Sequence, residues 1–493
     1  MESYSALKIA EIVGGSILHG DGNRLVSNVS TNSKEGNTTT LFVPIIGERV
    51  DAHNFIQDAY KNGMRVTFTM RDYIEEQTED MTYIKVTHTL DALQQFAAYY
   101  REQFTLPIIG ITGSVGKTTT KEMIAAALSV KYNVLKTSGN MNSQVGLPQM
   151  MLKIEREHDI AVIEMGMSLP GEMERLAKVA KPDLAVITNI GVSHIGQLGS
   201  KENIREAKLN IINEFNEGAM LFVNGEDELL KEVYDSCKEN KSSTDFTQKQ
   251  LKIKVSSETR KALETANVKA FGLQDGFEFY AKNIQNIGEQ TFFNFCFLDS
   301  RGRMIEEEII LNVLGTHNVL NAVVALAVAY TYGISPKDAK EGLFLYRPIS
   351  MRGQIERLQG ITLVDDTYNA SPDSMKSAVD VLLALPDAKR RIAVFADILE
   401  LGEMSRECHY GVGTYLSKTS VDLVVTIGKE ANYINEAIHE KNDKIESINF
   451  SENESAANYL LSELNHGDCI ILKGSRGMHL DEIVGKIKEK FQK

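Results

Sequence analysis

The sequence predicts an α/β fold of three domains, the last two of them built on parallel sheets. The chain has 493 residues, enough for roughly three domains of about 150 residues each. Short apolar runs typical of buried strands alternate with helical patterns along most of this length. One of these runs leads into a glycine-rich turn and then a helix. This order of elements is typical of parallel sheets that bind a ligand at their carboxyl edge.

The first predicted domain covers residues 1–105. Its predicted elements are two strands and two helices, at 41–46, 64–70, 52–62 and 90–104. The second helix ends at Leu106-Pro107, because a residue before proline disfavours the helical conformation. We place the first domain boundary at that point.

The central predicted domain covers residues 106–346. Strands are expected at 107–112, 160–164 and 184–188, a pair of strands within 277–298, and helices at 121–130, 170–180 and 318–332. Residues 236–266 are polar and rich in lysine, and we interpret them as a surface excursion.

The C-terminal predicted domain covers residues 347–493. Its strands are expected at 361–365, 391–395, 421–427 and 469–472, with helical patterns between them. This alternation predicts a doubly wound, Rossmann-like sheet.

Composition excludes several classes of protein. The chain carries 53 basic and 67 acidic side chains, a net charge of −14, which argues against a nucleic-acid partner. Its four cysteines form no CxxC pair, as in reducing compartments. The N-terminus lacks the pattern of a signal peptide, and the most apolar stretch, 319–330, is too short to cross a bilayer. We expect a cytoplasmic protein without membrane insertion, and a monomer.

The segment Gly110-Ile-Thr-Gly-Ser-Val-Gly-Lys-Thr-Thr-Thr120 predicts a phosphate-binding loop. Glycines let backbone N–H groups approach a polyphosphate, and a helix N-terminus adds positive potential. Lys117 would reach the terminal phosphates and Thr118 would bind Mg²⁺. The nucleotide-binding residues of the loop are Gly113, Ser114, Gly116, Lys117, Thr118 and Thr119. The loop is a variant, since Ile111 stands where the usual pattern has glycine, and the alternative is a plain turn with a surface lysine.

Two further residues are candidate Mg²⁺ ligands. Glu164 ends the apolar run 160–164, and His194 follows the run 184–188. Residues at the carboxyl ends of parallel strands face the ligand-binding crevice. The alternatives are a helix-capping or surface glutamate and an ordinary loop histidine.

Lys208 lies within the apolar stripe of a predicted helix at 201–215. A buried lysine is costly unless it is paired or chemically changed. Three readings stay open from the residues: the side chain extends along the stripe to solvent, it forms an inward salt bridge, or its neutral amine reacts with CO₂ to give a carbamate that ligates Mg²⁺.

The motifs together resemble the Mur ligases, the ATP-dependent amide ligases that build the peptide stem of bacterial cell-wall precursors. The matching segments are 113–122, 139–142, 146–148, 164–166, His194, 206–208, 317–322, 351–353, 365–373 and 473–476. Gly-Lys-Thr-Thr-Thr-Lys and Asp-Asp-Thr-Tyr-Asn-Ala-x-Pro are most specific for the branch that adds D-alanyl-D-alanine to UDP-N-acetylmuramoyl-tripeptide. The resemblance implies a UDP-sugar domain, a central ATPase domain, and a C-terminal domain that closes over the nucleotide.

The resemblance also implies roles for individual residues. Lys117, Lys208 and His194 are implied to be catalytic, with Lys208 carbamylated and two Mg²⁺ held by Thr118, Glu164, His194 and Lys208. Asn318 is implied to contact the adenine, and Arg352 and Asp366 the rest of the nucleoside. Asn321 is a further candidate cofactor-binding residue. Residues implied to contact the peptide substrates are Asn140, Asn142, Tyr368, Asn369, Lys473 and Arg476. In the N-terminal domain, Thr31, Ser33, Arg49 and His53 stand at plausible UDP-contacting positions, with an ordinary loop residue as the alternative for each.

Other functions make different demands on the sequence. A P-loop ATPase or GTPase switch should show a Walker-B aspartate where Glu164 stands, and a GTPase should show Asn-Lys-x-Asp, which is absent. A non-catalytic relative would be indicated by loss of Lys117, Glu164 or Lys208, and all three are present. The ligase that adds the third residue and folylpolyglutamate synthase are rivals within the family, and the segment 366–372 argues against both.

Overall fold

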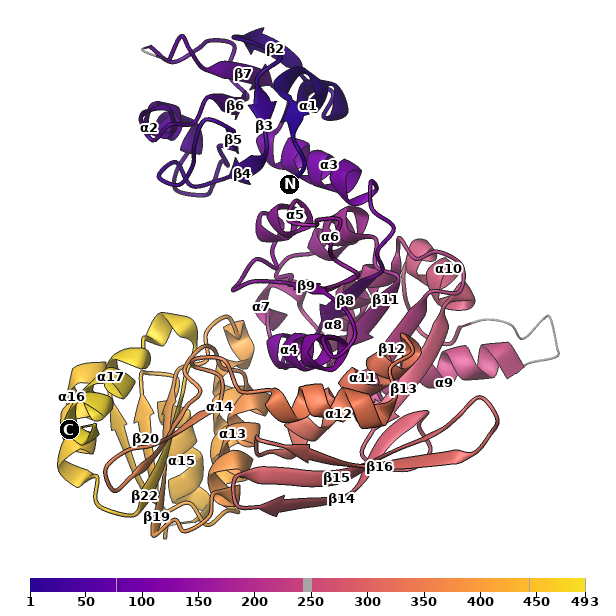
Figure 1. Cartoon of the computed structure of the whole chain (residues 1–493). Coiled ribbons are helices and arrows are strands. Elements are labelled where there is room, and N and C mark those ends of the chain that lie inside the picture. The colour runs from indigo at the N-terminus through magenta and orange to yellow at the C-terminus, as the bar shows by residue number, and fades with distance from the viewer. Residues whose placement is uncertain (77, 243–250, 443, 493) are drawn as a thin grey trace.

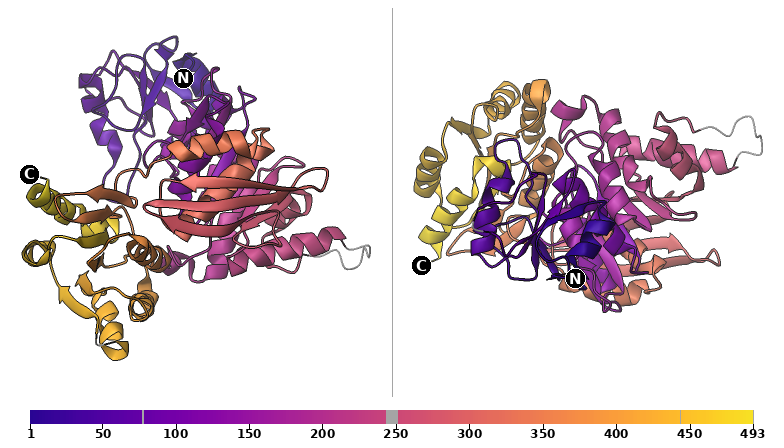
Figure 2. Two further views of the ribbon diagram at one scale, coloured as in Figure 1. Left: turned by 60° about the horizontal axis from the view of Figure 1, so that its bottom comes forward. Right: turned by 90° about the horizontal axis from the view of Figure 1, so that it is seen from above.

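The structure is a computed structural model that describes residues 1–76, 78–242, 251–442 and 444–492. Its three parts follow one another along the chain, and each contains its own main sheet (Figure 1). The three-part α/β architecture predicted from the sequence is confirmed. The C-terminal part lies beside the central part, and the N-terminal part extends away from both (Figures 1 and 2).

The N-terminal part is a five-stranded sheet in the order β2-β7-β6-β5-β4, with a small antiparallel pair β1-β3. The strands are β1 (Tyr4–Ser5), β2 (Ser16–His19), β3 (Leu25–Val26), β4 (Asn28–Ser30), β5 (Thr40–Phe42), β6 (Val66–Thr69) and β7 (Thr82–Lys85). The helical segments are α1 (Ala6–Ile12), η1 (Ala52–Phe55), α2 (Ile56–Lys61) and α3 (Thr89–Arg101). The predicted strand 41–46 ends early, at Phe42, with Pro44 just beyond it. Proline has no N–H to donate to a sheet.

The central part is a nine-stranded sheet in the order β16-β15-β14-β13-β12-β11-β8-β10-β9. Its strands are β8 (Ile108–Thr112), β9 (Val134–Lys136), β10 (Ile160–Glu164), β11 (Leu184–Ile187), β12 (Met220–Asn224), β13 (Asn267–Gly272), β14 (Phe279–Ile287), β15 (Gln290–Leu298) and β16 (Met304–Leu311). Pairing is parallel from β9 to β14 and antiparallel from β14 to β16. The predicted strand pair at 277–298 is therefore present, and β16 extends it.

Strand β8 lies where the strand order reverses, between β10 and β11. In open parallel sheets, ligands bind outside the carboxyl ends of the strands at this switch point. The predicted phosphate loop follows β8 directly, so the topology positions it at the expected crevice.

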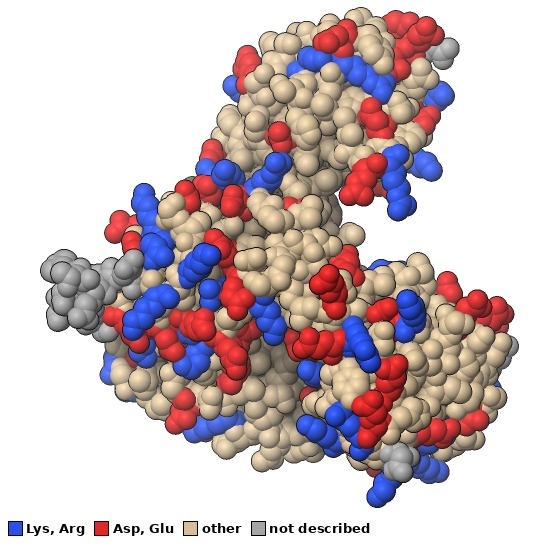
Figure 3. Space-filling model, turned by 180° about the vertical axis from the view of Figure 1, so that it is seen from behind, with Lys and Arg blue, Asp and Glu red and all other residues tan. Residues whose placement is uncertain are grey.

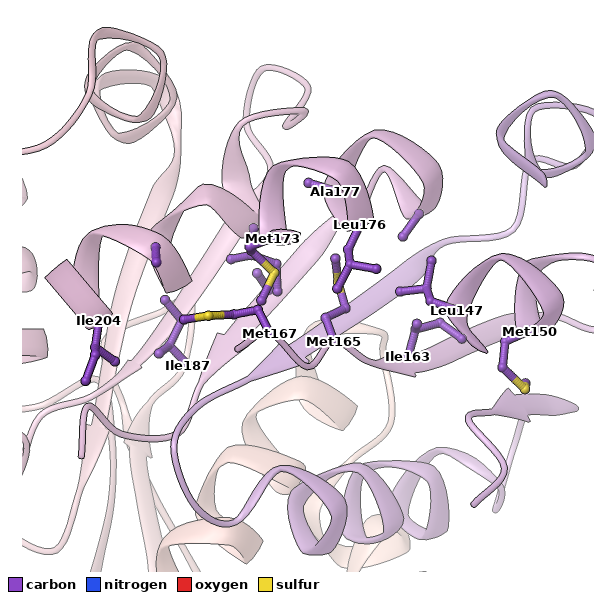
Figure 4. Close-up of a cluster of buried hydrophobic side chains, with 14 of the residues drawn as sticks. Leu147, Met150, Ile163, Met165, Met167, Met173, Leu176, Ala177, Ile187 and Ile204 are labelled. Atoms are coloured by element: carbon purple, nitrogen blue, oxygen red, sulfur yellow. The ribbon is translucent and has the colours of Figure 1, made fainter. Parts of the chain in front are cut away.

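Helices cover both faces of this sheet. They are α4 (Lys117–Leu128), α5 (Gly146–Met151), α6 (Glu172–Ala180), α7 (Ile195–Leu198), α8 (Lys201–Leu209), η2 (Asn210–Ile212), α9 (Glu228–Ser242), α10 (Ser257–Thr265), α11 (Thr316–Thr331) and α12 (Pro336–Leu345). On one face Ile163 and Met165 pack with Leu147 of α5 and Leu176 of α6 (Figure 4). On the other, α4 and α11 pack together over residues such as Ile111. This double burial explains why β8 and β10 read as continuous apolar runs.

The predicted surface excursion at 236–266 was wrong for much of its described length. Helix α9 continues to Ser242, and α10 begins at Ser257. Leu251, Ile253 and Leu263 are buried in the core of this part. The lysine-rich composition concealed an amphipathic pattern, in which a few apolar side chains face inward. The remainder of that prediction, residues 243–250, lies outside the described residues.

The C-terminal part is a six-stranded sheet in the order β17-β18-β22-β19-β20-β21, parallel except at β17. Its strands are β17 (Gln354–Arg357), β18 (Thr362–Asp365), β19 (Arg390–Ala396), β20 (Leu423–Ile427), β21 (Glu446–Phe450) and β22 (Asp468–Lys473). Its helical segments are α13 (Pro372–Ala384), η3 (Gly402–Met404), α14 (Ser405–Leu416), α15 (Asn432–Lys441), α16 (Asn453–Glu463), η4 (Arg476–Met478) and α17 (Asp481–Phe491). The doubly wound prediction is confirmed, and all four predicted strands are present.

Candidate active site

The phosphate loop connects β8 to α4 and requires two of its glycines. Gly113 has a φ of +150°, and a Cβ at this position would lie 1.9 Å from Oγ1 of Thr188. Gly116 has a φ of +83° at the N-cap of α4. Both angles lie in the region that favours glycine. Any side chain at Gly113 would also collide with Thr188, so conformation and space agree.

The loop is held by the segment that follows β11. The Ser114 N–H donates to the carbonyl oxygen of Asn189 at 3.1 Å, and the Val115 N–H donates to Asn189 Oδ1 at 2.8 Å. The Thr188 hydroxyl donates to the Val115 carbonyl at 2.5 Å. Sequence reasoning missed Asn189; the available signal was its position directly after the predicted strand 184–188.

Lys117 begins α4 and lies under the loop. Its Nζ donates to the Gly113 carbonyl oxygen at 2.8 Å. Burial lowers the pKa of Lys117, and the nearby Glu164 carboxylate opposes that shift. The ammonium group is thus held within reach of any phosphate bound by the loop.

Glu164 ends β10 and is buried at the floor of the site, with 2% of its surface exposed. Its Oε2 accepts a hydrogen bond from the Thr118 hydroxyl at 2.8 Å, and its Oε1 accepts one from Asn142 Nδ2 at 2.8 Å. Both partners are neutral. In the described part of the chain, no basic side chain forms a salt bridge with this carboxylate. Lys117 influences this carboxylate only through space; a buried carboxylate without a direct ion pair is costly, and a bound cation would offset its charge.

Lys208 lies on α8 and is only 2% exposed. Burial, with a smaller contribution from the positive charge of Lys117, moves its pKa well below the ordinary value for lysine. No carboxylate among the described residues forms an ion pair with it. Of the three readings left open by the sequence, the inward salt bridge is therefore absent. A side chain that is only 2% exposed does not reach solvent either, and burial shifts the equilibrium toward the neutral amine, the form that reacts with CO₂.

His194 precedes α7 in the left-handed conformation, with a φ of +64°. Its Nδ1 lies 2.7 Å from Oε2 of Glu400, a residue of the C-terminal part. Burial lowers the pKa of His194; Glu400 opposes this shift, and the charges of Lys208 and Lys117 add to it. His194, Lys208 and Lys117 therefore influence one another at one end of the sheet.

A cavity of about 880 Å³ opens between the central and C-terminal parts. Most of the predicted site residues line it: Ser114, Gly116, Lys117, Thr118, Thr119, Asn142, Glu164, Asn318, Asn321, Arg352, Asp366, Tyr368, Asn369 and Lys473. The others lie outside its lining: Thr31, Ser33, Arg49, His53, Gly113, Asn140, His194, Lys208 and Arg476. The phosphate loop forms one wall, and residues that follow β18, together with Lys473 at the end of β22, form the opposite one.

The C-terminal wall contains an ion pair and a stacked cation. Lys473 Nζ lies 2.6 Å from Oδ2 of Asp366. Burial raises the pKa of Asp366, and Lys473 opposes that shift. The guanidinium carbon of Arg352 lies 3.9 Å from the centre of the Tyr368 ring. Both pairs fix polar side chains along this wall of the cavity.

The start of α11 lines the cavity with Asn318 and Asn321, which were predicted, and with His317, which was not among the predicted site residues. Asn321 Oδ1 accepts from the Thr120 hydroxyl at 3.0 Å, which connects α11 to α4. His317 lines the cavity beside Asn318. Burial and the charge of Lys473 lower the pKa of His317 to about 4, so its ring is neutral at pH 7. His317 is the first residue of the segment 317–322, which already resembled the Mur ligases, so that segment could have pointed to it.

The predicted UDP-contacting residues lie apart from this cavity. Thr31 and Ser33 belong to the loop after β4, whose neighbours Ser30 and Gly36 line a second cavity of about 390 Å³ against the central part. Arg49 is exposed. The ring of His53 is buried, with Nδ1 2.6 Å from Asp51 Oδ1 and Nε2 accepting from the Met70 N–H at 3.1 Å. In this arrangement His53 organises its own loop.

The described residues lack both a complete metal cluster and a helix that could span a membrane. No group of three or more His, Cys, Asp or Glu side chains gathers there as a complete metal site. A cation near Glu164 would therefore depend on phosphate or carbamate oxygens as well. Within the same residues, no helix combines the length and apolar character needed to cross a membrane. On the face shown in Figure 3, acidic and basic side chains are interspersed.

Two family descriptions match the chain. The Mur ligase middle domain matches residues 111–329, and the glutamate ligase domain of Mur ligases matches residues 351–476. Together they cover the phosphate loop, the Glu164 site and the C-terminal wall of the cavity.

Whole-chain comparisons agree. The chain is 35% identical to the UDP-N-acetylmuramoyl-tripeptide–D-alanyl-D-alanine ligase of Bacillus subtilis, over 98% of this chain and 97% of the relative. MurF from Acinetobacter baumannii is similar in structure, with a TM-score of 0.85, 28% identity and 99% of both chains covered. MurF ligase from Thermotoga maritima, solved in complex with ADP, has a TM-score of 0.77 and 28% identity, covering 94% of this chain and 97% of that one. From its site, its domain order and these likenesses, the chain belongs to the Mur ligase family.

Proposed function

We propose that this chain joins D-alanyl-D-alanine to UDP-N-acetylmuramoyl-tripeptide with the use of ATP, giving the pentapeptide precursor of peptidoglycan. The observation that carries the proposal is the composite cavity: the phosphate loop lines one wall, and the segment that includes Asp366, Tyr368 and Asn369 lines the other. An ATPase that acts as a switch needs only the wall formed by the phosphate loop. A ligase must bring an activated carboxylate and an amine together beside the nucleotide.

The first chemical step is transfer of the γ-phosphoryl group of ATP to the tripeptide carboxylate. A carboxylate is a poor acyl donor, and the acyl phosphate provides a leaving group. Phosphoryl transfer depends mainly on positioning and on neutralising charge. The loop N–H groups and Lys117 hold the phosphates, and Asn318, Asn321, Arg352 and Asp366 hold the nucleoside.

Glu164, Thr118, His194 and Lys208 would hold Mg²⁺, two ions in our proposal. The fit rests on the buried Glu164 carboxylate, which has only neutral hydrogen-bond partners. Bound Mg²⁺ would neutralise the charge that develops on the phosphate oxygens. The chain's own part is to fix the carboxylate: Thr118 and Asn142 each hold one of its oxygens.

Lys208 would act as a carbamate. Its burial without a counter-ion lowers the pKa of the amine and so favours the neutral form, and a neutral amine attacks CO₂ to form an N-carboxylate with loss of a proton. The product is an anion suited to the same cations. This modification would explain why a lysine occupies an apolar helix face.

The second step is attack of the dipeptide amine on the acyl phosphate, with release of phosphate. We assign residues 1–105 to the UDP-sugar, residues 106–346 to ATP, and residues 347–493 to closing over ATP and binding the dipeptide. The substrate-contacting residues in this assignment are Thr31, Ser33, Arg49, Asn140, Asn142, Tyr368, Asn369, Lys473 and Arg476, while the buried His53 holds its loop in place. Closure would protect the acyl phosphate from water. We further propose a cytoplasmic monomer with small-molecule partners.

The test is phosphate release from ATP and Mg²⁺ in the presence of UDP-N-acetylmuramoyl-tripeptide, measured with and without D-alanyl-D-alanine. We expect release to require both substrates, and the UDP product to gain the mass of the dipeptide less one water. Release that is independent of the dipeptide would favour an ATPase switch or a ligase for another amine.

A further inference from the structure

The ion pair between His194 and Glu400 crosses from the central to the C-terminal part. The two residues lie 206 positions apart, and Nδ1 of the imidazole is 2.7 Å from Oε2 of the carboxylate. Both residues adopt positive φ, +64° for His194 and +66° for Glu400. Such conformations are unfavourable for residues other than glycine, and they concentrate at functional sites.

The backbones around this pair approach closely. A Cβ on Gly196 would lie 3.2 Å from the Glu400 carbonyl oxygen, and one on Gly402 would lie 3.5 Å from the Gly196 Cα. Helix α7 contacts η3 across this boundary. The Glu400 segment therefore fits closely against α7, and the tight approach at Gly196 favours glycine there.

The Glu400 segment is also anchored within its own domain. The Leu399 N–H donates to the Ser475 hydroxyl at 2.9 Å, and the Ile398 N–H donates to Nε2 of the buried His409 at 2.9 Å. His409 is in turn fixed by Nδ1, which lies 2.7 Å from the Ser405 carbonyl oxygen. The carboxylate thus reaches His194 from a defined position.

We infer that Glu400 is a positioning residue that orients His194 from the opposite domain. Its carboxylate accepts a hydrogen bond from Nδ1–H, which fixes the ring and leaves Nε2 unprotonated as the nitrogen available to a cation. Carboxylates that bind a histidine in this way orient the ring and raise the basicity of the ligand nitrogen. The cation site is then complete only when the C-terminal domain is docked, so closure and cation binding favour each other. This inference rests on the proposed function, since it takes His194 as a cation ligand.

The first test measures the affinity of the full chain for Mn²⁺ by electron paramagnetic resonance, with saturating ADP in bicarbonate buffer. The protein can bind more than one Mn²⁺ ion, and these ions are distinguished by their affinities. The Mn²⁺ ion whose affinity falls in His194→Gln is the one held by His194. Glu400→Gln should weaken the binding of that ion about 10- to 100-fold. Glu403→Gln is the matched control, because Glu403 is exposed in the same segment, and it should change nothing.

A double variant separates action through His194 from any other effect. In the His194→Gln background, Glu400→Gln should weaken Mn²⁺ binding no further. An equal loss in both backgrounds would overturn the inference, as would tighter or unchanged binding in Glu400→Gln alone. If His194→Gln leaves the affinity for every bound Mn²⁺ ion unchanged, His194 is not a cation ligand and the inference fails. Dipeptide-dependent ligation would still test the proposed function independently.

The second test reads the tautomer directly. In protein labelled with ¹⁵N-histidine, the signals missing from His194→Gln identify this ring. We expect a protonated Nδ1 and an unprotonated Nε2 in the wild type and in Glu403→Gln, and loss of this preference in Glu400→Gln. A wild-type ring protonated on Nε2 alone would overturn the inference.

Discussion

The Thr118 hydroxyl donates a hydrogen bond of 2.8 Å to the Glu164 carboxylate. This bond connects the first turn of α4 to the end of β10, and its two residues lie 46 positions apart in the sequence. It places a buried carboxylate at the floor of the phosphate loop, where a cation beside the phosphates would need it. The pair explains how a glutamate takes the place expected for a Walker-B aspartate.

Replacing Glu164 with glutamine should preserve the volume of the side chain and remove its charge. We expect kcat to fall by at least about 100-fold, equivalent to about 2.7 kcal/mol of transition-state stabilisation. Steady-state ligation measured across a range of Mg²⁺ concentrations checks this. A variant with normal kcat at ordinary Mg²⁺ would contradict the assignment of Glu164.

Lys117→Ala should abolish ligation, because Lys117 supplies the positive charge inside the loop. Binding of UDP-N-acetylmuramoyl-tripeptide should change little, since its proposed UDP contacts lie in the N-terminal domain. Calorimetric titration with this substrate and a phosphate-release assay provide the two measurements. Normal turnover in the variant would remove the phosphate loop from the mechanism.

Gly113→Ala should damage the loop for two reasons: the positive φ and the Cβ position 1.9 Å from Thr188 Oγ1. We expect a loss of about 1–3 kcal/mol in the free energy of unfolding and weaker ADP binding. Chemical denaturation and an ADP titration measure these. The control is Gly411→Ala in α14, where a Cβ meets no atom within 4 Å; it should be neutral or stabilising by up to about 1 kcal/mol. Equal effects at both glycines would contradict the structural account.

Lys208→Ala should be inactive and partly rescued by a short carboxylate such as acetate, which would take the place of the carbamate. Removal of CO₂ and bicarbonate should lower wild-type activity reversibly. An active Lys208→Ala enzyme would mean that the lysine has no catalytic role and only packs along its helix.

Lys208 should also make folding stability depend on pH. Its folded-state pKa is well below the unfolded value of 10.5, so between these two values the unfolded chain binds the extra proton. The free energy of unfolding therefore rises with pH across this window. In CO₂-free buffer, Lys208→Met should remove that dependence and stabilise the protein at pH 7 by on the order of 1–3 kcal/mol. Denaturation at several pH values checks it; an unchanged pH profile would show that Lys208 is accommodated without cost.

The sequence alone determined the order of the domains and the chemistry of the loop. Buried parallel strands require continuous apolar runs, and phosphate binding requires glycines and a lysine at fixed local spacing, so both can be read from neighbouring residues. The buried position of Lys208 also followed from helical periodicity. The lysine-rich segment near α9 and α10 misled the interpretation, because a few inward-facing apolar residues stabilise helices of polar composition.

Tertiary structure alone decided which distant residues meet. Asn189 bonds the loop because β11 lies beside β8, and Asn142 reaches Glu164 because the loop after β9 crosses the end of β10. His194 meets Glu400 only because two domains pack together. Strand order and domain packing arise from burial summed over the whole chain, and local sequence patterns do not encode them.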